Sequence, residues 1–255
     1  KQKLTGHTGK AVKAIIGNVF STALIQREIS ENPMHFIAKR SHPKAPDPVP
    51  FAIEEEDFQK LLSISDQYQA FWEIMAGTGM RLGEAMGLQW DRVNLDKRTI
   101  FIDRQVHPVQ DVDTRKNSLQ FAPTKTGKNR TIKFTRGVAA SFKRHKAQQQ
   151  LLLKPEKLQD NLVFPNIYGK KQSGSMYNKR LAKRCADLGL QKLTCKNFRS
   201  TYATWCSAER MDIKTLHFQM GHKSEVTTLR YYAAPTEETV EREVDKMEGK
   251  FTKSG

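Results

Sequence analysis

The sequence has few cysteines and none of the motifs by which common cofactors are held. Its three cysteines, Cys185, Cys195 and Cys206, are odd in number and lack a C-x-x-C spacing, so neither a disulfide framework nor a zinc site is expected. A reducing cytoplasm fits this usage best. A P-loop, a dinucleotide-binding glycine fingerprint and an H-E-x-x-H motif are all missing from the sequence. We therefore expect a reaction that needs no ATP, no resident metal and no other cofactor.

Long apolar runs are missing too. No stretch approaches the ~20 residues that a transmembrane helix needs, and no signal peptide is found, so no membrane partner is expected. The first residue is Lys rather than Met, which favours a fragment of a longer protein. The length still permits one large domain or two modest ones with a real core.

What the sequence has in excess is positive charge. Lys and Arg total 43 against 27 Asp and Glu, which gives a formal net charge of +16 over 255 residues. This balance predicts a polyanionic partner, with nucleic acid ahead of an anionic membrane surface.

The chain divides at a proline-rich stretch. "SHPKAPDPVP" (41–50) has four prolines in ten residues, so we expect an extended spacer there. Before it, apolar residues recur at i, i+3, i+4, i+7 and i+8 over residues 8–29, which predicts a helix with one buried side. A short helical piece is expected after Asn32-Pro33. This first segment is too small to be a stable domain alone.

After the spacer, the patterns predict a fold that is mainly α with a small antiparallel β-sheet. "TIFIDRQV" and "RTIKF" are typical of strands, and "TKTGKN" before the second has the chemistry of a hairpin turn. Acidic residues at the start of "IEEEDFQKLLSI" predict the opening of a helix. Further helices are expected on either side of Gly77-Thr78-Gly79, from about residue 136, and at 174–187, 196–209, 212–219 and 224–232, with a charged helix in the last twenty residues.

Several cations lie beside special backbone rather than on ordinary solvated helix faces. Taken singly, each has a simple explanation: an arginine after a glycine turn often caps a helix, a turn lysine is usually solvated, and a histidine or tyrosine usually packs. Their order and contexts together point to chemistry. The residues of this set are Arg81 after "GTGM", Lys125 in "PTKTGKNRTI", Lys196 and Arg199 on one helical face in "TCKNFRSTYATW", His222 in "MGHK", and Tyr231 nine residues further on.

A tyrosine that attacks a phosphodiester needs partners of these kinds. Two arginines can clamp the non-bridging oxygens and offset the charge of the transition state. A lysine on a mobile hairpin could protonate the leaving 5′ oxygen. A nearby cation favours loss of the phenol proton, whose unperturbed pKa is about 10. A covalent phosphotyrosine would keep the bond energy for rejoining, so no nucleotide cofactor would be required.

On these motifs the sequence resembles the tyrosine recombinase (phage integrase) family. "GTGMRLGEAMGLQWDRVNL" is similar to the first family box, with Arg81 as its arginine and Glu84 in the supporting acidic position. "PTKTGKNRTI" resembles the hairpin of the family lysine, which falls on Lys125. "LTCKNFRSTYAT" resembles the second box, with Arg199 on its arginine. The resemblance covers about residues 51–235.

The end of the resemblance identifies a nucleophile. "MGHKSEVTTLRYY" is similar to the G-H box, with His222, and to the tyrosine box T-T-x-x-Y, which makes Tyr231 the nucleophile. Tyr232 is one helical step of about 100° away and is expected to face elsewhere. One departure is Lys196, which stands where the second box usually has histidine. The related type IB topoisomerases also use lysine there, so activity is expected to survive, although lysine is a poor base for the tyrosine proton.

The resemblance implies a function and partners. It implies a site-specific DNA recombinase, an integrase encoded by a phage or bacterium, that cleaves and rejoins strands through a 3′-phosphotyrosine and exchanges them via a Holliday junction. Double-stranded DNA, further copies of the chain in a tetramer, and DNA-bending and directionality proteins are the implied partners. The domains would be 1–40, the end of a helical core-binding domain; 41–50, a linker; 51–235, a catalytic domain of the tyrosine recombinase/type IB topoisomerase-like fold; and 236–255, a tail that docks on a neighbouring protomer.

Two alternatives stay open. A type IB topoisomerase would share the chemistry without exchanging strands between sites, although the helices before the spacer favour a recombinase. A non-catalytic DNA-binding protein on the same fold would need only a basic face. The target sequence and the kind of mobile element are not predicted, because base contacts depend on groove geometry.

Overall fold

The computed structural model describes residues 6–36, 51–111, 113–115 and 117–232. The chain splits into two compact units, residues 1–49 and 50–255. The predicted linker and the predicted C-terminal tail lie outside the described residues. No helix within the described ranges is long and apolar enough to cross a membrane.

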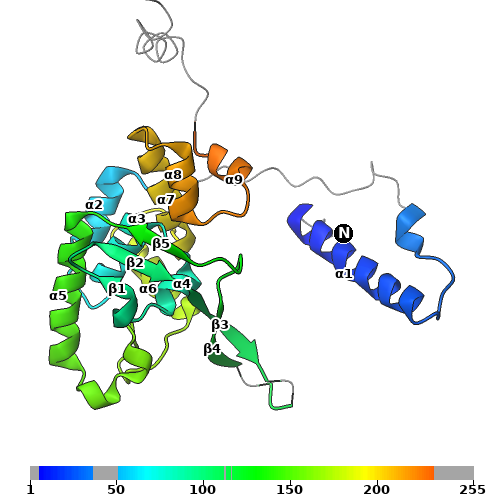
Figure 1. Cartoon of the computed structure of the whole chain (residues 1–255), viewed down its shortest axis with the longest axis horizontal. Helices are drawn as coiled ribbons and strands as arrows, with labels where there is room; N and C mark the ends of the chain where they lie inside the picture. The colour runs from blue at the N-terminus through cyan, green and yellow to red at the C-terminus, as the bar shows by residue number, and fades with distance from the viewer. Residues whose placement is uncertain (1–5, 37–50, 112, 116, 233–255) are drawn as a thin grey trace, which may run out of the picture. The chain divides into compact units, whose positions relative to one another are not determined.

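The first unit contains the helix and the short helical piece that the sequence predicts. They are α1 (Gly6–Ile25) and η1 (Pro33–Phe36), blue in Figure 1. Asn32 ties the turn between them, because its side chain accepts a hydrogen bond from the Met34 N–H at 2.9 Å and donates one to Ser21 Oγ at 3.2 Å. The expectation of a buried apolar side is wrong within this unit, where Ile15 is 63% exposed and Val19 61%. In the described part of this unit, η1 is the only other helical element. Its four residues are too few to cover the apolar face of α1.

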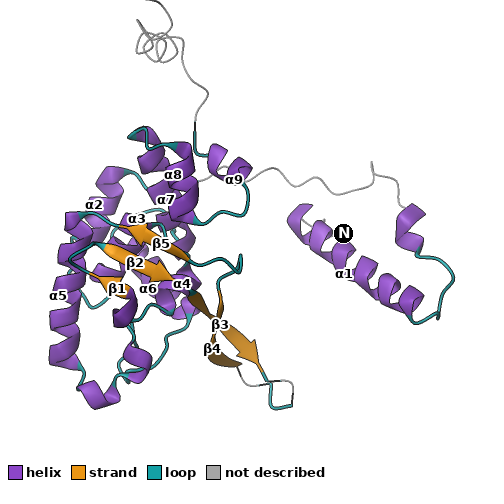
Figure 2. Ribbon diagram, in the orientation of Figure 1, coloured by secondary structure: helices purple, strands orange, loops and turns teal. Residues whose placement is uncertain are grey.

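The second unit is mainly helical, as Figure 2 shows. Its α-helices are α2 (Glu55–Leu62), α3 (Gln69–Thr78), α4 (Leu82–Met86), α5 (Arg136–Leu152), α6 (Gly174–Asp187), α7 (Cys195–Ala208), α8 (Ile213–Met220) and α9 (Glu225–Leu229), with 3₁₀ turns η3 (Trp90–Arg92), η4 (Pro155–Lys157) and η5 (Gln159–Asn161). The bounds follow the predicted helices closely except at the end of the described chain. There α9 stops at Leu229, and i→i+3 bonds from the backbone N–H groups of Tyr231 and Tyr232 form a tighter turn.

The strands form two small antiparallel sheets. They are β1 (Val93–Asn94), β2 (Thr99–Ile102), β3 (Arg104–Gln110), β4 (Asn117–Pro123) and β5 (Arg130–Lys133). β1, β2 and β5 make one sheet, in which Ile100 pairs with Ile132, and β3 and β4 make a separate hairpin. The turn in "TKTGKN" therefore joins β4 to β5, strands of different sheets, and the prediction of a hairpin turn there is wrong. The β3–β4 hairpin was not predicted as a pair and separates β2 from its partner β5.

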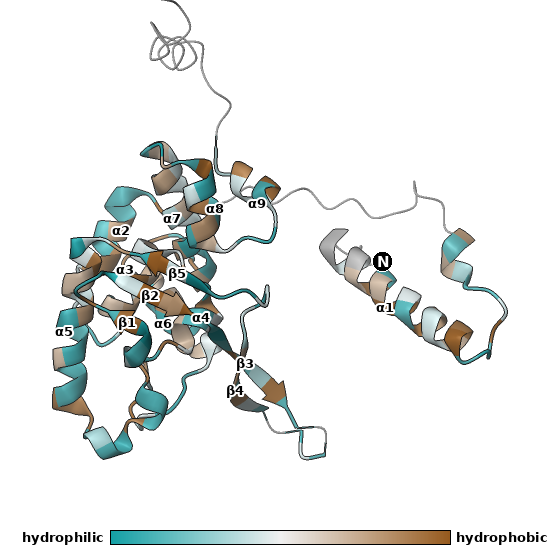
Figure 3. Ribbon diagram, in the orientation of Figure 1, coloured by the Kyte–Doolittle hydropathy of each residue, from teal (hydrophilic) through white to brown (hydrophobic). Residues whose placement is uncertain are grey.

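The core of the second unit forms around α3. Phe71, Trp72 and Ile74 on this helix are buried, and the Trp72 ring stacks on Phe198 of α7 with centroids 5.5 Å apart. In the neighbouring sheet, β2 ("TIFI") is coloured mostly as hydrophobic in Figure 3. Because α3 packs on α5 and on α7, its C-terminal end is held in a fixed place. That end leads directly into the predicted arginine turn.

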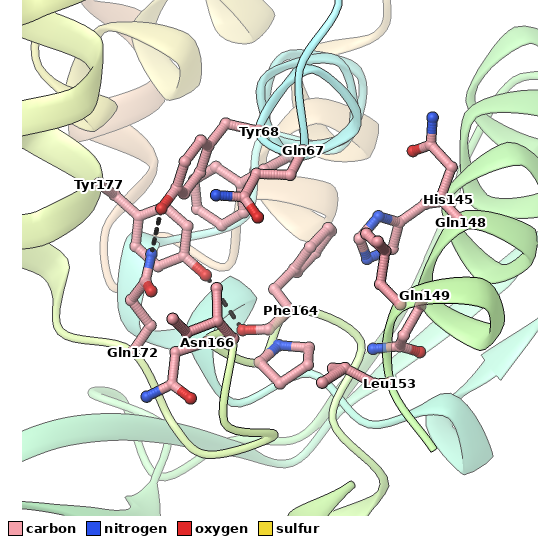
Figure 4. Close-up of a pocket in the computed structure, with 14 residues that line it drawn as sticks. Gln67, Tyr68, His145, Gln148, Gln149, Leu153, Phe164, Asn166, Gln172 and Tyr177 are labelled. Atoms are coloured by element: carbon pink, nitrogen blue, oxygen red, sulfur yellow. Dashed lines mark hydrogen bonds between the residues drawn. The ribbon is translucent and has the colours of Figure 1, made fainter. Parts of the chain in front are cut away.

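A cavity of about 270 Å³ lies at the other end of α3, between the C-terminal half of α5, residues 164–167 and α6 (Figure 4). Tyr177 Oη donates to the Phe164 carbonyl at 3.1 Å, and Gln172 donates to Tyr68 Oη at 3.4 Å. His145 Nε2 is hydrogen-bonded to the Val163 carbonyl at 2.6 Å, and burial lowers the pKa of this imidazole. No residue of the predicted site lines this cavity.

Candidate active site

The predicted site forms around two glycine turns. Gly79 ends α3 with φ of +63°, and a Cβ there would lie 2.4 Å from the Tyr202 ring. Gly221 ends α8 with φ of +59°. Glycine adopts this left-handed backbone without strain, so both helices stop sharply. The residues that follow, Arg81 and His222, are turned toward the same region, because an Arg81 Nη2–H donates to the Gly221 carbonyl.

Arg81 is held by the buried carboxylate of Glu84. Arg81 Nη1 donates to Glu84 Oε1 at 2.8 Å, and the Arg81 backbone N–H donates to Oε2 at 2.9 Å, which caps the start of α4. Burial by itself would raise the pKa of Glu84. Hydrogen bonds and charge from Arg130 and Arg81 outweigh burial and hold this pKa below its ordinary value. Glu84 is therefore an ionised support beneath Arg81.

Arg199 of α7 connects the two glycine turns. Its Nη1 donates to the Gly79 carbonyl at 2.6 Å and its Nη2 to the Met220 carbonyl at 2.5 Å. Burial lowers the pKa of Arg199, and the nearby Arg81 guanidinium lowers it further. A guanidinium has five N–H donors, so both arginines keep donors for an oxyanion after these protein contacts. The pair is thus fixed in orientation and suited to bind a phosphate.

Lys196 lies on the same helix as Arg199. It is one turn before Arg199 at the start of α7, where Thr194 and Asn197 cap the helix with hydrogen bonds of 2.8 and 2.9 Å. A cavity of about 290 Å³ is lined by Arg81, Lys196 and Arg199 together. The Lys196 side chain is exposed, so its ammonium group can reach a ligand that enters this cavity.

His222 is a neutral imidazole. Burial, then the charges of Arg199 and Arg81, lower its pKa to about 3. Its Nδ1 is hydrogen-bonded to the buried Thr228 Oγ1 at 2.8 Å, and His217 Nδ1 approaches the same hydroxyl at 3.3 Å. The ring is therefore oriented by α9 as well as by the Gly221 turn.

The two tyrosines have different surroundings. The Tyr231 ring stacks on His222, and its hydroxyl makes no hydrogen bond to the residues that the structure describes. Tyr232 Oη instead donates to the Met211 carbonyl at 2.5 Å, and burial raises its pKa. Tyr232 is thus tied to the loop before α8, whereas Tyr231 lies beside the histidine.

Lys125 is not among the residues that line the cavity beside Arg81, Lys196 and Arg199. It lies in the exposed turn after β4, where the Gly127 N–H donates to the Thr124 carbonyl at 2.8 Å. A Cβ added at Gly127 would meet nothing within 4 Å, so the turn is open on that side. Lys125 stands next to the cluster in sequence, five residues before a buried arginine of β5.

That arginine, Arg130, was missed by the sequence analysis. Its Nη1 and Nη2 donate to both oxygens of Glu84 at 3.0 and 2.7 Å, and its Nε donates to the Gln219 carbonyl at 3.1 Å. The strand periodicity held a signal for it. Arg130 and Ile132 are two apart on β5 and share its buried face, so strand alternation places this charge inward together with the isoleucine.

Within the described residues, no group of three or more His, Cys, Asp or Glu side chains could hold a metal ion. The cluster consists of cations around one carboxylate, with a neutral imidazole and a phenol at its edge. This arrangement can bind an oxyanion and place a phenol oxygen close to it.

Residues 52–238 match the model of the phage integrase family. The integrase of Staphylococcus phage L54a is 28% identical over 185 residues, which cover 68% of this chain and 49% of that protein. The XerC-like tyrosine recombinase of Caldanaerobacter subterraneus subsp. tengcongensis is 22% identical over 254 residues, or 89% of this chain and 63% of that protein. The chain thus spans from about half to just under two thirds of the length of these relatives.

Among solved structures, the Tn1549 transposon integrase in complex with a circular intermediate DNA has the same fold. The TM-score is 0.78 at 21% identity, and the match covers 95% of this chain and 80% of that one. The predicted fold class, mainly α with a small antiparallel sheet, is confirmed.

Proposed function

The chain belongs to the phage integrase family, and on that basis we propose that it is a site-specific DNA recombinase that cleaves and rejoins strands through a 3′-phosphotyrosine. One observation carries the proposal. Two oriented guanidiniums and a neutral imidazole lie beside a phenol whose hydroxyl has no hydrogen bond to the described residues. A protein that only bound DNA would need the positive charge, but not this arrangement.

In the proposed cleavage, Tyr231 Oη attacks the scissile phosphorus. A bond forms between this oxygen and phosphorus, and the bond from phosphorus to the 5′ oxygen breaks. Arg81 and Arg199 bind the non-bridging oxygens, with Lys196 as a third donor from the edge of the cavity. These contacts stabilise the charge that accumulates on the phosphoryl oxygens in the transition state.

His222 is the proposed acceptor of the Tyr231 proton. An arginine cannot serve, because it keeps its proton in a protein, whereas His222 is neutral and adjacent. A bound phosphodiester would bring negative charge into a cluster of cations. That charge favours the imidazolium, so it raises the pKa of His222 and makes the ring a better base in the complex.

Lys125 is the proposed donor of a proton to the leaving 5′ oxygen. The open turn on which it lies leaves space for a movement toward bound DNA. Rejoining would reverse both transfers: a 5′ hydroxyl attacks the phosphotyrosine, Lys125 takes its proton, and Tyr231 leaves as a phenol.

The proposed partner is double-stranded DNA at recombination sites. The net charge of +16 supports this, and so does the DNA complex of the Tn1549 integrase. We further propose strand exchange in a tetramer via a Holliday junction, with residues 236–255 docking on a neighbour and with DNA-bending and directionality proteins assisting. Phage and bacterial relatives favour a bacterial cytoplasm as the place of reaction.

The test uses a nicked duplex whose short cleaved end diffuses away and traps the covalent intermediate. A pool of DNAs from the ends of the source element supplies the site, and the wild type is compared with Tyr231→Phe and Tyr232→Phe on a denaturing gel. We expect an adduct that only Tyr231→Phe abolishes. Loss in Tyr232→Phe instead would move the nucleophile by one residue. Tight binding of a verified site without any adduct would favour the non-catalytic alternative.

A further inference from the structure

A buried arginine outside the predicted set lies beneath the site. Arg130, the first residue of β5, is 7% exposed. Two parts of the chain meet at its guanidinium: Glu84 of α4, and the end of α8 with the Gln219 carbonyl and Gly221. A Cβ added at Gly221 would lie 2.8 Å from Arg130 Cζ, so the guanidinium packs directly against this backbone.

Glu84 is shared between two arginines. Its Oε1 accepts from Arg81 at 2.8 Å and from Arg130 at 3.0 Å, while Oε2 accepts from Arg130 at 2.7 Å and from the Arg81 backbone at 2.9 Å. Arg130 therefore holds both oxygens of the carboxylate that orients Arg81. Without Arg130, only the two hydrogen bonds from Arg81 itself hold the carboxylate, so the carboxylate and the Arg81 guanidinium can shift together.

Stability alone is a poor explanation for this arrangement. A buried ion pair contributes little compared with a well-packed apolar pair of similar volume, because desolvation offsets most of the Coulomb attraction. What a forked guanidinium adds is geometry, since its fixed fork matches a carboxylate and a third N–H remains for another acceptor. In Arg130 that remaining donor, Nε, goes to Gln219, two residues before the Gly221 turn that carries His222.

We propose that Arg130 is a positioning residue for strand cleavage. It fixes Arg81 through Glu84 and supports the Gly221–His222 turn from beneath, so that the phosphate clamp and the proposed base keep one geometry. This inference rests on the proposed function. A different route would run through the turn of Lys125, which lies five residues before Arg130, and the experiment separates the two.

The variants are Arg130→Lys, which keeps the charge but loses the fork, and Arg130→Met, which keeps the length without charge. Arg184→Lys is the matched control. Arg184 is also a buried arginine, 5% exposed, that pairs with Asp66 and donates to the Leu61 carbonyl at 3.0 Å, and neither partner belongs to the cluster.

Each protein is given two nicked duplexes, one with the ordinary scissile phosphodiester and one with sulfur in place of the bridging 5′ oxygen. A thiolate leaves without a proton, so the sulfur duplex bypasses the need for a general acid. We expect Arg130→Lys to slow single-turnover adduct formation on the order of 10²-fold, as a misplaced clamp would, with DNA affinity nearly unchanged. Sulfur should rescue Lys125→Ala but neither Arg130 variant, and Arg184→Lys should cleave like the wild type.

Two results would overturn the proposal. Rescue of Arg130→Lys by sulfur would show that Arg130 acts through the Lys125 turn. Equal loss of rate in Arg130→Lys and Arg184→Lys, both folded by circular dichroism, would make the role of Arg130 merely structural. If the wild type formed no adduct, the proposed function would fail first. NMR would then test the role of Arg130 separately. If Arg130 positions the His222 turn, its variants shift the ring signals of His222, and Arg184→Lys leaves those signals in place. Unshifted signals in the Arg130 variants would exclude a positioning role.

Discussion

The rings of His222 and Tyr231 lie parallel, with centroids 6.3 Å apart and planes inclined by 12°. The histidine follows the Gly221 turn and the tyrosine follows α9, so the pair is held from two elements. Thr228 fixes this relationship, because its buried hydroxyl is hydrogen-bonded to His222 from within α9. The proposed nucleophile therefore has its neutral neighbour in place before DNA binds.

The hydroxyl of Thr228 is the first feature to test. In Thr228→Val the shape is kept, but the hydrogen bonds to His222 and His217 are lost. We expect adduct formation to slow by on the order of 10²-fold, the lower end of what general acid–base catalysis supplies. Thr227→Val is the control, because it makes the same substitution at an exposed position, whereas Thr228 is buried. Equal rates in the two variants in a single-turnover assay would remove Thr228 from the mechanism.

The two tyrosines should separate chemistry from stability. Tyr232→Phe loses the hydrogen bond to the Met211 carbonyl, which should lower the free energy of unfolding by about 1 kcal/mol. Tyr231→Phe loses no hydrogen bond to a described residue, so its stability should equal that of the wild type while its adduct disappears. Urea denaturation of both variants, beside the adduct gel, measures the two effects. A loss of stability in Tyr231→Phe alone would contradict the assignment.

The parts of the site that could be predicted from the sequence are those with a local backbone signature. Gly79 before Arg81 and Gly221 before His222 both adopt positive φ at a helix end, and such turns are visible in sequence because glycine is needed there. Lys196 and Arg199 share a face of one helix, which spacing alone predicts. In each case the signal lies within a few residues.

What could not be predicted depends on distant contacts. Arg130 is 46 residues from Glu84 and 89 from Gln219, so nothing near it in sequence indicates its partners. β4, "NSLQFAP", has no clear alternation of buried and exposed positions, so the β3–β4 hairpin escaped notice and the Lys125 turn was assigned to the wrong pair of strands. The apolar face of α1 predicted a helix correctly, but periodicity does not say whether a covering surface is present.

Stability should fall in mild acid because of buried neutral histidines. Burial lowers the pKa of both His145 and His222, so the unfolded chain binds more protons than the folded one below its own histidine pKa of about 6.5. The contribution is fully present above that pH and is lost as the pH falls below it. In His145→Phe, the loss per pH unit should be smaller by up to about 1.4 kcal/mol. Urea denaturation at about pH 7.5, 6 and 5, on either side of the unfolded pKa, measures this difference. An unchanged slope would mean that the folded chain protonates His145 as readily as the unfolded chain does.

Binding to DNA should depend steeply on salt. If the protein neutralises about 6–10 phosphates, its affinity should fall by roughly 10³–10⁵ between about 50 and 200 mM salt, because each contact releases condensed counterions.

Lys125 offers a sharper test, since it is an exposed cation on an open turn. If it reaches the DNA backbone, Lys125→Ala should reduce the slope of log affinity against log salt by about one. Lys183→Ala is the control, because Lys183 is exposed but paired with Asp187 on α6 and is no part of the cluster. Fluorescence anisotropy with a labelled duplex measures both slopes. Equal slopes in Lys125→Ala and Lys183→Ala would mean that the turn stays away from DNA in the bound state, and the proposed proton donor would have to be sought elsewhere.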